Sequence, residues 1–320
     1  MTGAGMTDLS VRIGALTLAN PVMPASGTFA EGMAQAIDLD LLGAFVTKTI
    51  TRELRQGNPL PRVAETESGL INSIGIPSRG VPYFLDHTLP FFAQRRPPLI
   101  VSISAPTAEG FASLAAALTR PGVAGIEANI SCPNIEADGR AFAQRCDSTE
   151  AAVRALRAAT PLPLWVKLTP NVGDIAEIAR AAEAAGADAL VVANTILALS
   201  IDVATFRPRL GNMMGGLSGP AIKPIVLRQV YQCARAVRIP VIGCGGIATT
   251  EDAVEYLLAG ATAMQVGTAT FRHPGAMPAI IDGLAQFCGR RDIARVAELT
   301  GAMRSEEADE PDVAWTSPAA

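Results

Sequence analysis

The sequence predicts a single (β/α)8 TIM barrel, and three observations support this fold class. Short, continuously apolar runs alternate with amphipathic segments along the chain, a pattern typical of parallel strands covered on both faces. Counting residues 20–26 as the first strand gives eight strand–helix units, the number that closes a barrel. The 320 residues, 49% of them hydrophobic, can bury one large core, and barrels of this size form one domain. Periodicity favours a barrel over an open sheet but does not by itself establish closure.

The elements follow in a regular order. Residues 9–19 precede the barrel and predict a small hairpin that turns at Gly14 and Ala15. Ser148 and Thr249 are residue types that cap the N-terminus of a helix. The predicted strands span 20–26, 43–49, 98–105, 124–132, 162–169, 187–195, 239–247 and 262–270. The predicted helices span 107–120, 148–160, 174–186, 223–237, 249–259 and 274–290.

Two long segments, 50–81 and 196–222, interrupt the alternation without a clear helix. Loops of this length are uncommon in a compact domain and are usually functional. Both follow a predicted strand, so we expect them at the C-terminal mouth of the barrel, where active sites of this fold are built. Residues 1–305 are predicted to form the barrel, and the acidic residues 306–320 a mobile tail.

Composition argues against several classes of partner. The net charge is −4 and no run of Lys and Arg marks a nucleic-acid surface. No signal peptide is recognisable, and no apolar run reaches the roughly 18 residues of a membrane span. The five cysteines are an odd number without CxxC or metal-ligand spacing. We therefore expect a reduced, cytoplasmic protein with no disulfide framework and no metal site.

Polar residues stand at the ends of four predicted strands: Lys48, Asn129, Lys167 and Asn194. A buried Lys is rarely chosen for packing, so the two lysines suggest that the site binds anionic groups. The alternative is that each Lys covers the barrel rim and keeps its ammonium group in water. The Asn amides offer both donors and acceptors to a planar polar ligand.

Glycines lie near the ends of the last two predicted strands. Gly245 and Gly246 stand near the end of the seventh, and Gly267 and Thr268 near the end of the eighth. In (β/α)8 barrels the loops after these strands frequently bind phosphate through backbone N–H groups, and glycine lets the backbone approach closely. The alternative is ordinary barrel-corner geometry without a ligand.

The fourth predicted strand ends in Asn129-Ile130-Ser131-Cys132-Pro133-Asn134. Pro133 restrains the turn by fixing its own φ. The Cys132 thiol has an ordinary pKa near about 8.5 and could act as a base or nucleophile. Taken alone, an inert buried cysteine is the more common interpretation.

Together these motifs resemble the class 1 dihydroorotate dehydrogenases, flavin enzymes of pyrimidine biosynthesis. The matching stretches occur in family order between about residue 9 and about residue 290. They are Asn20-Pro21 to Ala25-Ser26-Gly27, Thr47-Lys48-Thr49, Gly57-Asn58-Pro59 with Pro61-Arg62, Asn72-Ser73-Ile74-Gly75, the Asn129–Asn134 stretch, Val166-Lys167-Leu168, Asn194-Thr195, Gly215-Gly216-Leu217-Ser218-Gly219, Gly245-Gly246 and Gly267-Thr268.

The resemblance implies one FMN per chain over the barrel mouth. Cys132 would remove the C5 proton of dihydroorotate while C6 delivers hydride to flavin N5, which yields orotate. The implied phosphate contacts are Gly245, Gly246, Gly267 and Thr268, and the other implied FMN contacts are Ser26, Gly27, Lys48, Thr49, Asn129, Lys167 and Gly216. The implied substrate contacts are Lys48, Asn72, Ile74, Gly75, Ile76, Asn129, Asn134, Asn194 and Thr195.

The base residue and the N-terminus indicate the subtype. The membrane-bound class uses Ser as its base and carries an N-terminal helical extension, whereas this chain has Cys132 and only about nine residues before the hairpin. The opening, Leu9 to Thr28, is similar to that of the NAD-linked class 1B type. That type pairs a catalytic dimer with an electron-transfer subunit that carries FAD and a 2Fe-2S cluster. No cysteine cluster here could ligate iron, so these cofactors are expected only on a partner. A homodimer is expected, within a heterotetramer if that partner is present.

Four alternatives remain at this stage: a fumarate-using class 1A homodimer, a dihydropyrimidine dehydrogenase-like flavin barrel, a lyase and a non-catalytic barrel protein. In the lyase, Lys48 or Lys167 would form a Schiff base with a sugar phosphate. Residues 133–147 are additionally predicted to act as a lid that excludes water.

Overall fold

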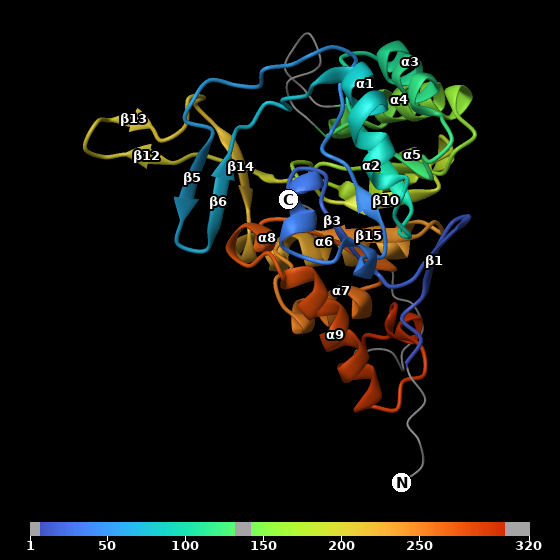
Figure 1. Cartoon of the computed structure of the whole chain (residues 1–320). Helices are drawn as coiled ribbons and strands as arrows, with labels where there is room; N and C mark the ends of the chain where they lie inside the picture. Colours follow the sequence, from blue (N-terminus) through green and yellow to red (C-terminus); the bar gives the residue numbers. More distant parts are fainter. Residues whose placement is uncertain (1–6, 132–141, 305–320) are drawn as a thin grey trace, which may run out of the picture.

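The computed structural model describes residues 7–131 and 142–304 and contains a closed eight-stranded barrel (Figure 1). The strands lie in the order β3-β16-β15-β10-β9-β8-β7-β4. The Gly43 N–H donates to the Val22 carbonyl at 2.8 Å and joins the first strand to the chain just before the second, which closes the cylinder. The predicted fold class is confirmed. The strands are β3 Val22–Pro24, β4 Phe45–Val46, β7 Leu99–Ile103, β8 Gly125–Asn129, β9 Leu164–Lys167, β10 Ala189–Val192, β15 Val241–Cys244 and β16 Ala263–Val266.

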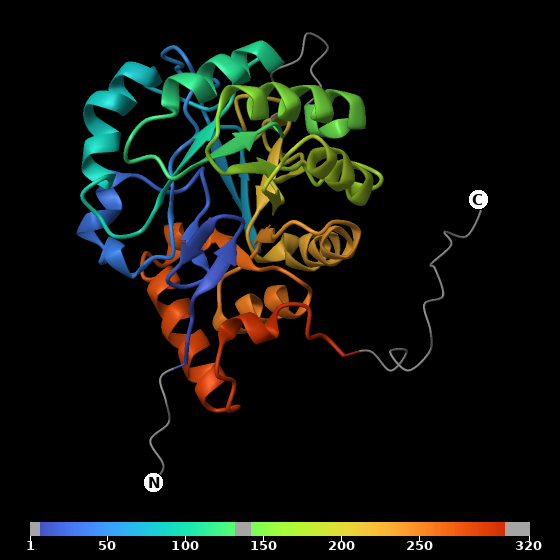
Figure 2. The ribbon, with the colours of Figure 1, turned by 90° about the vertical axis from the view of Figure 1, so that its right-hand side faces the viewer.

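Helices surround the strands, as Figure 2 shows. Helix α7 begins as predicted: the Thr249 hydroxyl accepts from the Asp252 N–H and the Asp252 carboxylate accepts from the Thr249 N–H. The predicted cap at Ser148 is wrong, because α4 already begins at Cys146 and the Ser148 hydroxyl donates to the Phe142 carbonyl at 2.7 Å. The long helices are α3 Ala108–Leu118, α4 Cys146–Ala159, α5 Ile175–Ala184, α6 Lys223–Ala236, α7 Thr250–Leu258 and α9 Ala276–Gly289.

One helical segment was not predicted. It runs through α1 Gly80–Tyr83, a π-helical turn Phe84–Thr88 and α2 Leu89–Phe92. Two prolines within 80–92 weaken the helical pattern in the sequence, yet the buried Phe84 and Phe92 anchor the segment in the core. The short helical turns are Glu31–Gln35, Leu39–Leu41, Phe142–Gln144, Pro220–Ile222, α8 Ala269–Arg272 and Val296–Leu299.

The predicted N-terminal hairpin is confirmed as β1 Val11–Ile13 and β2 Leu16–Leu18. Gly14 occupies the turn with φ +58°, a conformation that suits glycine. Gly14 also lies against Asp188, the residue before β10. The hairpin therefore covers the N-terminal end of the barrel, away from the predicted site.

The two long segments are not irregular; they pair with each other. β5 Val63–Thr66, β6 Gly69–Asn72, β14 Gly215–Ser218 and β11 Ile196–Ala198 form one antiparallel sheet in the order β11-β14-β6-β5. β12 Ile201–Asp202 and β13 Arg207–Pro208 extend from it as a two-stranded arm (Figure 1). The register places Gly216 opposite Asn72. Two stretches more than 140 residues apart in sequence are thus brought to one wall of the barrel mouth.

Within residues 7–131 and 142–304 no helix is both long and apolar enough to cross a membrane. The same residues hold no group of three or more His, Cys, Asp or Glu that could bind a metal ion. Cys146, Cys233, Cys244 and Cys288 are free thiols. The predicted tail, residues 306–320, lies outside the described residues.

Candidate functional site

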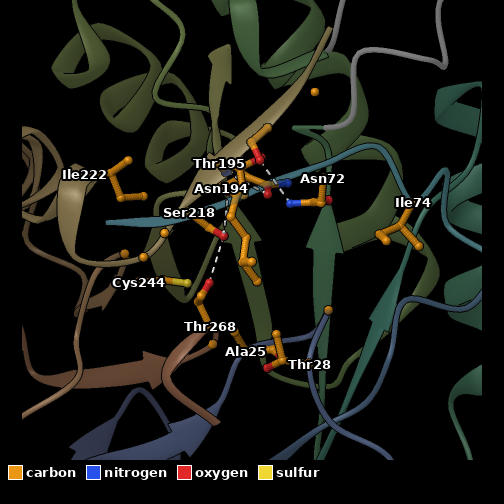
Figure 3. Close-up of a pocket in the computed structure, with 18 of the residues that line it drawn as sticks. Ala25, Thr28, Asn72, Ile74, Asn194, Thr195, Ser218, Ile222, Cys244 and Thr268 are labelled. Atoms are coloured by element: carbon orange, nitrogen blue, oxygen red, sulfur yellow. Dashed lines mark hydrogen bonds between the residues drawn. The ribbon is translucent and has the colours of Figure 1, made fainter. Parts of the chain in front are cut away.

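A cavity of about 1130 Å³ opens at the C-terminal ends of the barrel strands, beneath the sheet β11-β14-β6-β5 (Figure 3). Every predicted site residue that the structure describes lines it, although these residues come from nine separate stretches of chain. They are Ser26, Gly27, Lys48, Thr49, Asn72, Ile74, Gly75, Ile76, Asn129, Lys167, Asn194, Thr195, Gly216, Gly245, Gly246, Gly267 and Thr268.

Hydrogen bonds fix the amide side chains on one side of the cavity. The Ser131 hydroxyl donates to Asn129 Oδ1 at 2.7 Å, and Asn194 Nδ2 donates to the Ser131 hydroxyl at 2.7 Å. Asn129 Nδ2 in turn donates to the Thr49 hydroxyl at 3.3 Å. The amides are therefore oriented by the protein itself, which lowers the entropy lost on ligand binding.

Ser131 is a site residue that the sequence reasoning missed. Its side chain is 4% exposed and links Asn129 to Asn194 within the cavity wall. The available signal was its position two residues after Asn129, since alternate residues of an extended chain share a side.

Lys167 ends β9 and reaches the cavity floor with 3% of its surface exposed. Its ammonium donates to Gln265 Oε1 at 2.8 Å. Burial lowers the pKa of Lys167, but Cys244 and Glu127 raise it by more, so the net direction is upward. The Lys167 ammonium therefore stays charged, which suits an electron-rich ligand edge.

Lys48 follows β4 and contrasts with Lys167. Burial lowers its pKa, and among residues 7–131 and 142–304 no carboxylate forms an ion pair with it. A partly buried ammonium without a carboxylate partner is suited to bind the anionic group of a ligand.

The wall formed by β6 and β14 is held closely together. Asn72 Nδ2 donates to the Gly216 carbonyl at 3.1 Å, and a methyl group added at Gly216 would overlap the Thr195 hydroxyl. Asn171, which was not predicted, donates to the Thr195 carbonyl at 3.1 Å and accepts from the Leu197 N–H at 2.8 Å. Asn171 thereby fixes the backbone that carries Asn194 and Thr195.

Residues 74–76 form a tethered turn at the cavity edge. Gly75 and Ile76 both have positive φ, +75° and +50°. Arg55 Nε donates to the Gly75 carbonyl at 2.7 Å, and the Asn58 N–H donates to the Ile74 carbonyl at 3.1 Å. These bonds hold a conformation that an Ile rarely adopts by itself.

Two glycines at strand ends, Gly27 after β3 and Gly267 after β16, leave bare backbone at the cavity surface. A Cβ built on Gly27 meets nothing within 4 Å, and one built on Gly267 makes only ordinary contacts of 3.4–4.0 Å. Both positions line the cavity, so a side chain there would enter space that a ligand can use. The neighbouring Thr268 hydroxyl is 2.7 Å from the Ser218 hydroxyl (Figure 3). This surface fits a phosphate bound by backbone N–H groups.

Cys132 and Asn134 lie outside the described residues, and their roles stay predictions. Ser131, the residue before Cys132, lines the cavity, as does Gln144 after the gap. Most of the predicted lid, 133–147, also lies outside. Its described end is the helical turn Phe142–Gln144 and the start of α4 at Cys146.

The family model described as "Dihydroorotate dehydrogenase" matches residues 8–288. Curated relatives named "Dihydroorotate dehydrogenase B (NAD(+)), catalytic subunit" include the protein of Desulforamulus reducens, which is 50% identical over 92% of this chain and 98% of its own length. The protein of Trichlorobacter lovleyi is 49% identical over the same shares, and that of Porphyromonas gingivalis is 46% identical over 93% and 98%.

A solved structure shares the fold: dihydroorotate dehydrogenase of Eimeria tenella in complex with ferulenol. It superposes with a TM-score of 0.75 at 23% identity, over 92% of this chain and 88% of that chain. At this identity the likeness supports the fold alone. The family model and the curated relatives confirm the resemblance predicted from the motifs, and they show that the chain belongs to the dihydroorotate dehydrogenase family.

Proposed function

We propose that the chain is the catalytic subunit of an FMN-dependent enzyme that oxidises dihydroorotate to orotate in the synthesis of the pyrimidine nucleotide UMP. One observation carries this proposal. All the described residues to which the resemblance assigns a cofactor or substrate contact line a single cavity, in a chain whose relatives are named for this reaction.

The cavity fits FMN. We assign its phosphate to the bare backbone at Gly245, Gly246, Gly267 and Thr268, and the electron-rich edge of its ring to the Lys167 ammonium. When bound, FMN supplies the acceptor for the hydride that leaves C6 of the substrate. The raised pKa of Lys167 argues against a lyase in which that amine must be neutral to form a Schiff base.

Dihydroorotate combines a carboxylate with a planar ring rich in N–H and C=O groups. We assign the carboxylate to Lys48 and the turn at Ile74, Gly75 and Ile76, and the ring edges to the amides of Asn72, Asn129 and Asn194, with Thr195 and Asn134. A site of oriented amides rejects analogues that leave a buried amide unpaired. The hydrogen bonds of Asn129 and Asn194 to Ser131 support this assignment.

We assign proton removal at C5 to Cys132. C5 is adjacent to a carbonyl, so loss of its proton builds negative charge on oxygen, and oriented donors stabilise that charge. The adjacent Ser131 lines the cavity, which supports this assignment. Cys132 acts as the thiolate, so proton removal becomes faster as pH rises toward the pKa of the thiol.

The relatives' name includes NAD(+) and a catalytic subunit. We therefore propose that electrons pass from FMN to FAD and a 2Fe-2S cluster on a partner subunit and then to NAD. The five cysteines of this chain have no cluster-ligating spacing. A homodimer within a heterotetramer, located in the cytoplasm, remains the predicted assembly.

The purified chain tests this directly. We expect it to bind FMN and to oxidise dihydroorotate with an artificial dye, but not with NAD or fumarate. Activity with fumarate would instead indicate the class 1A type. A chain that binds no FMN and reduces no dye would contradict the proposed function.

The pH dependence of kcat/KM for dihydroorotate should be bell-shaped. On the acid side the rate rises as Cys132 ionises. On the alkaline side it falls, because burial lowers the pKa of Lys48 and the neutral amine no longer attracts the substrate carboxylate. Initial rates measured with the dye across the pH range check this shape.

A Lys48→Arg variant separates the alkaline limb from ionisation of the substrate. The guanidinium stays charged up to about pH 12, so the alkaline limb should move to higher pH even if the maximum rate is lower. An alkaline limb at the same pH in both enzymes would remove Lys48 from this role.

A further inference from the structure

Glu127 is the one fully buried carboxylate of the described chain, with 0% of its surface exposed. It lies on β8 two residues before Asn129, and alternate residues of a strand share a side. Asn129 lines the cavity whereas Glu127 does not. Glu127 therefore points into the barrel one layer below the cavity floor, in a core that is otherwise largely apolar.

A single amide connects Glu127 to Lys167. Lys167 Nζ donates to Gln265 Oε1 at 2.8 Å, and Gln265 Nε2 donates to Glu127 Oε2. An ammonium can only donate, so the amide oxygen of Gln265 must face Lys167 and its NH2 group must face Glu127. The direction of both bonds is thus set by chemistry, and it requires Glu127 to accept. This is the arrangement expected of a charged amine, with Glu127 as the acceptor at the far end of the amide.

Among the described residues, Glu127 is the one carboxylate that acts on the Lys167 amine. The titratable groups that act on the Lys167 amine are Cys244 from β15 and Glu127 from β8. Burial raises the pKa of the Cys244 thiol by more than the nearby Lys167 lowers it. Glu127 Oε1 has no hydrogen-bond partner among residues 7–131 and 142–304.

Buried charges are not a general requirement of a stable core. Replacing a buried ion pair with well-packed apolar side chains is often neutral or stabilising, whereas removing one partner is costly. Three polar side chains retained in the barrel core, with the Lys167 end alone exposed to the cavity, therefore point to a role at the cavity.

We propose that Glu127 is a positioning residue which, through Gln265, keeps the Lys167 ammonium charged and directed at the cavity floor. The consequence for the cofactor rests on the proposed function: Lys167 would then favour the reduced, negatively charged flavin, and loss of Glu127 would lower the reduction potential of bound FMN. The state of the Lys167 amine itself does not depend on FMN, so it can be tested separately.

The test compares Glu127→Gln with the parent chain before FMN is added. Acetic anhydride modifies only neutral amines, and mass spectrometry reports the modification of Lys167 and Lys48 in one sample. At about pH 8 the rate at Lys167 should rise about 10-fold in Glu127→Gln, which corresponds to about 1.4 kcal/mol of lost stabilisation of the ammonium. The rate at Lys48 should not change.

Two further variants make the test decisive. Gln265→Met keeps Glu127 but removes the connecting amide, and should also speed modification of Lys167. Glu251→Gln removes an exposed carboxylate on α7 and should change neither lysine. An unchanged modification rate at Lys167 in both Glu127→Gln and Gln265→Met would overturn the proposal. An equal rise in the modification rates of Lys167 and Lys48 would also overturn it, because that result would indicate a loosened cavity. If Glu127→Gln does not fold, Gln265→Met alone decides the outcome.

Potentiometry of the FMN-loaded variants provides the second measurement. The midpoint potential in Glu127→Gln should be lower than in the parent, because the Lys167 ammonium is no longer directed at the cavity floor, and it should fall further when Lys167→Met removes the charge. Failure of every variant, including the parent, to bind FMN would count against the proposed function while leaving the amine measurement valid.

Discussion

Replacing Cys132 with alanine should slow reduction of bound FMN by dihydroorotate about 10²- to 10⁴-fold, the usual contribution of a general base. The proton on C5 would then have no acceptor on the protein. The cofactor and substrate contacts described above come from other residues, so FMN and orotate should bind to the variant with nearly unchanged affinity. Anaerobic stopped-flow absorbance of the flavin measures the reduction rate, and orotate titration measures the binding.

A second cysteine serves as the matched control. Cys146 begins α4, does not line the cavity, and burial raises the pKa of its thiol. Cys146→Ala should therefore reduce FMN at the rate of the parent chain. Near-normal reduction in Cys132→Ala, or an equal loss in both variants, would remove Cys132 from the role of base.

The site could be predicted largely because the fold places strand ends together. Lys48, Asn129, Lys167 and Asn194 are polar residues at the ends of apolar runs, and a barrel brings all such ends to one face. Once the sequence indicates eight strand–helix units, the meeting of these residues follows from topology and needs no knowledge of side-chain packing.

The wall over the cavity could not be predicted in the same way. β6 and β14 are four residues each and pair across more than 140 residues of sequence. Neither shows the alternation that identifies a half-buried strand, since glycines occupy several of their positions. The helical segment 80–92 was missed for a local reason, because its prolines disfavour the helical pattern that buried Phe84 and Phe92 nevertheless stabilise.

The connection from Glu127 to Lys167 is a third feature that could not be predicted from the sequence. The sequence does place a Glu and a Gln inside two apolar strands, and a buried charge always requires an explanation. It does not show that Gln265 on β16 reaches both Glu127 on β8 and Lys167 on β9 across the barrel. That information comes only from the register of the closed sheet.

The second large effect is expected at the phosphate end of the cavity. Gly267→Ala should weaken FMN binding about 10²-fold, the result of losing one or two charge-assisted hydrogen bonds worth about 1.5–3 kcal/mol each. The added methyl would lie where the phosphate must approach the backbone. Quenching of FMN fluorescence during titration of the apoprotein gives the dissociation constants.

Gly267→Ala should weaken FMN binding without changing the stability of the fold. The new methyl at Gly267 would make only ordinary contacts, 3.4 Å from Ala25 and 3.6 Å from Thr28, so the thermal unfolding temperature should stay within a few degrees of the parent value. Gly173→Ala is the control, because its Cβ meets nothing within 4 Å and Gly173 does not line the cavity. FMN should bind to that control as to the parent. Equal affinities in Gly267→Ala and Gly173→Ala would show that the phosphate lies elsewhere, since a methyl group cannot share the space that a bound phosphate occupies.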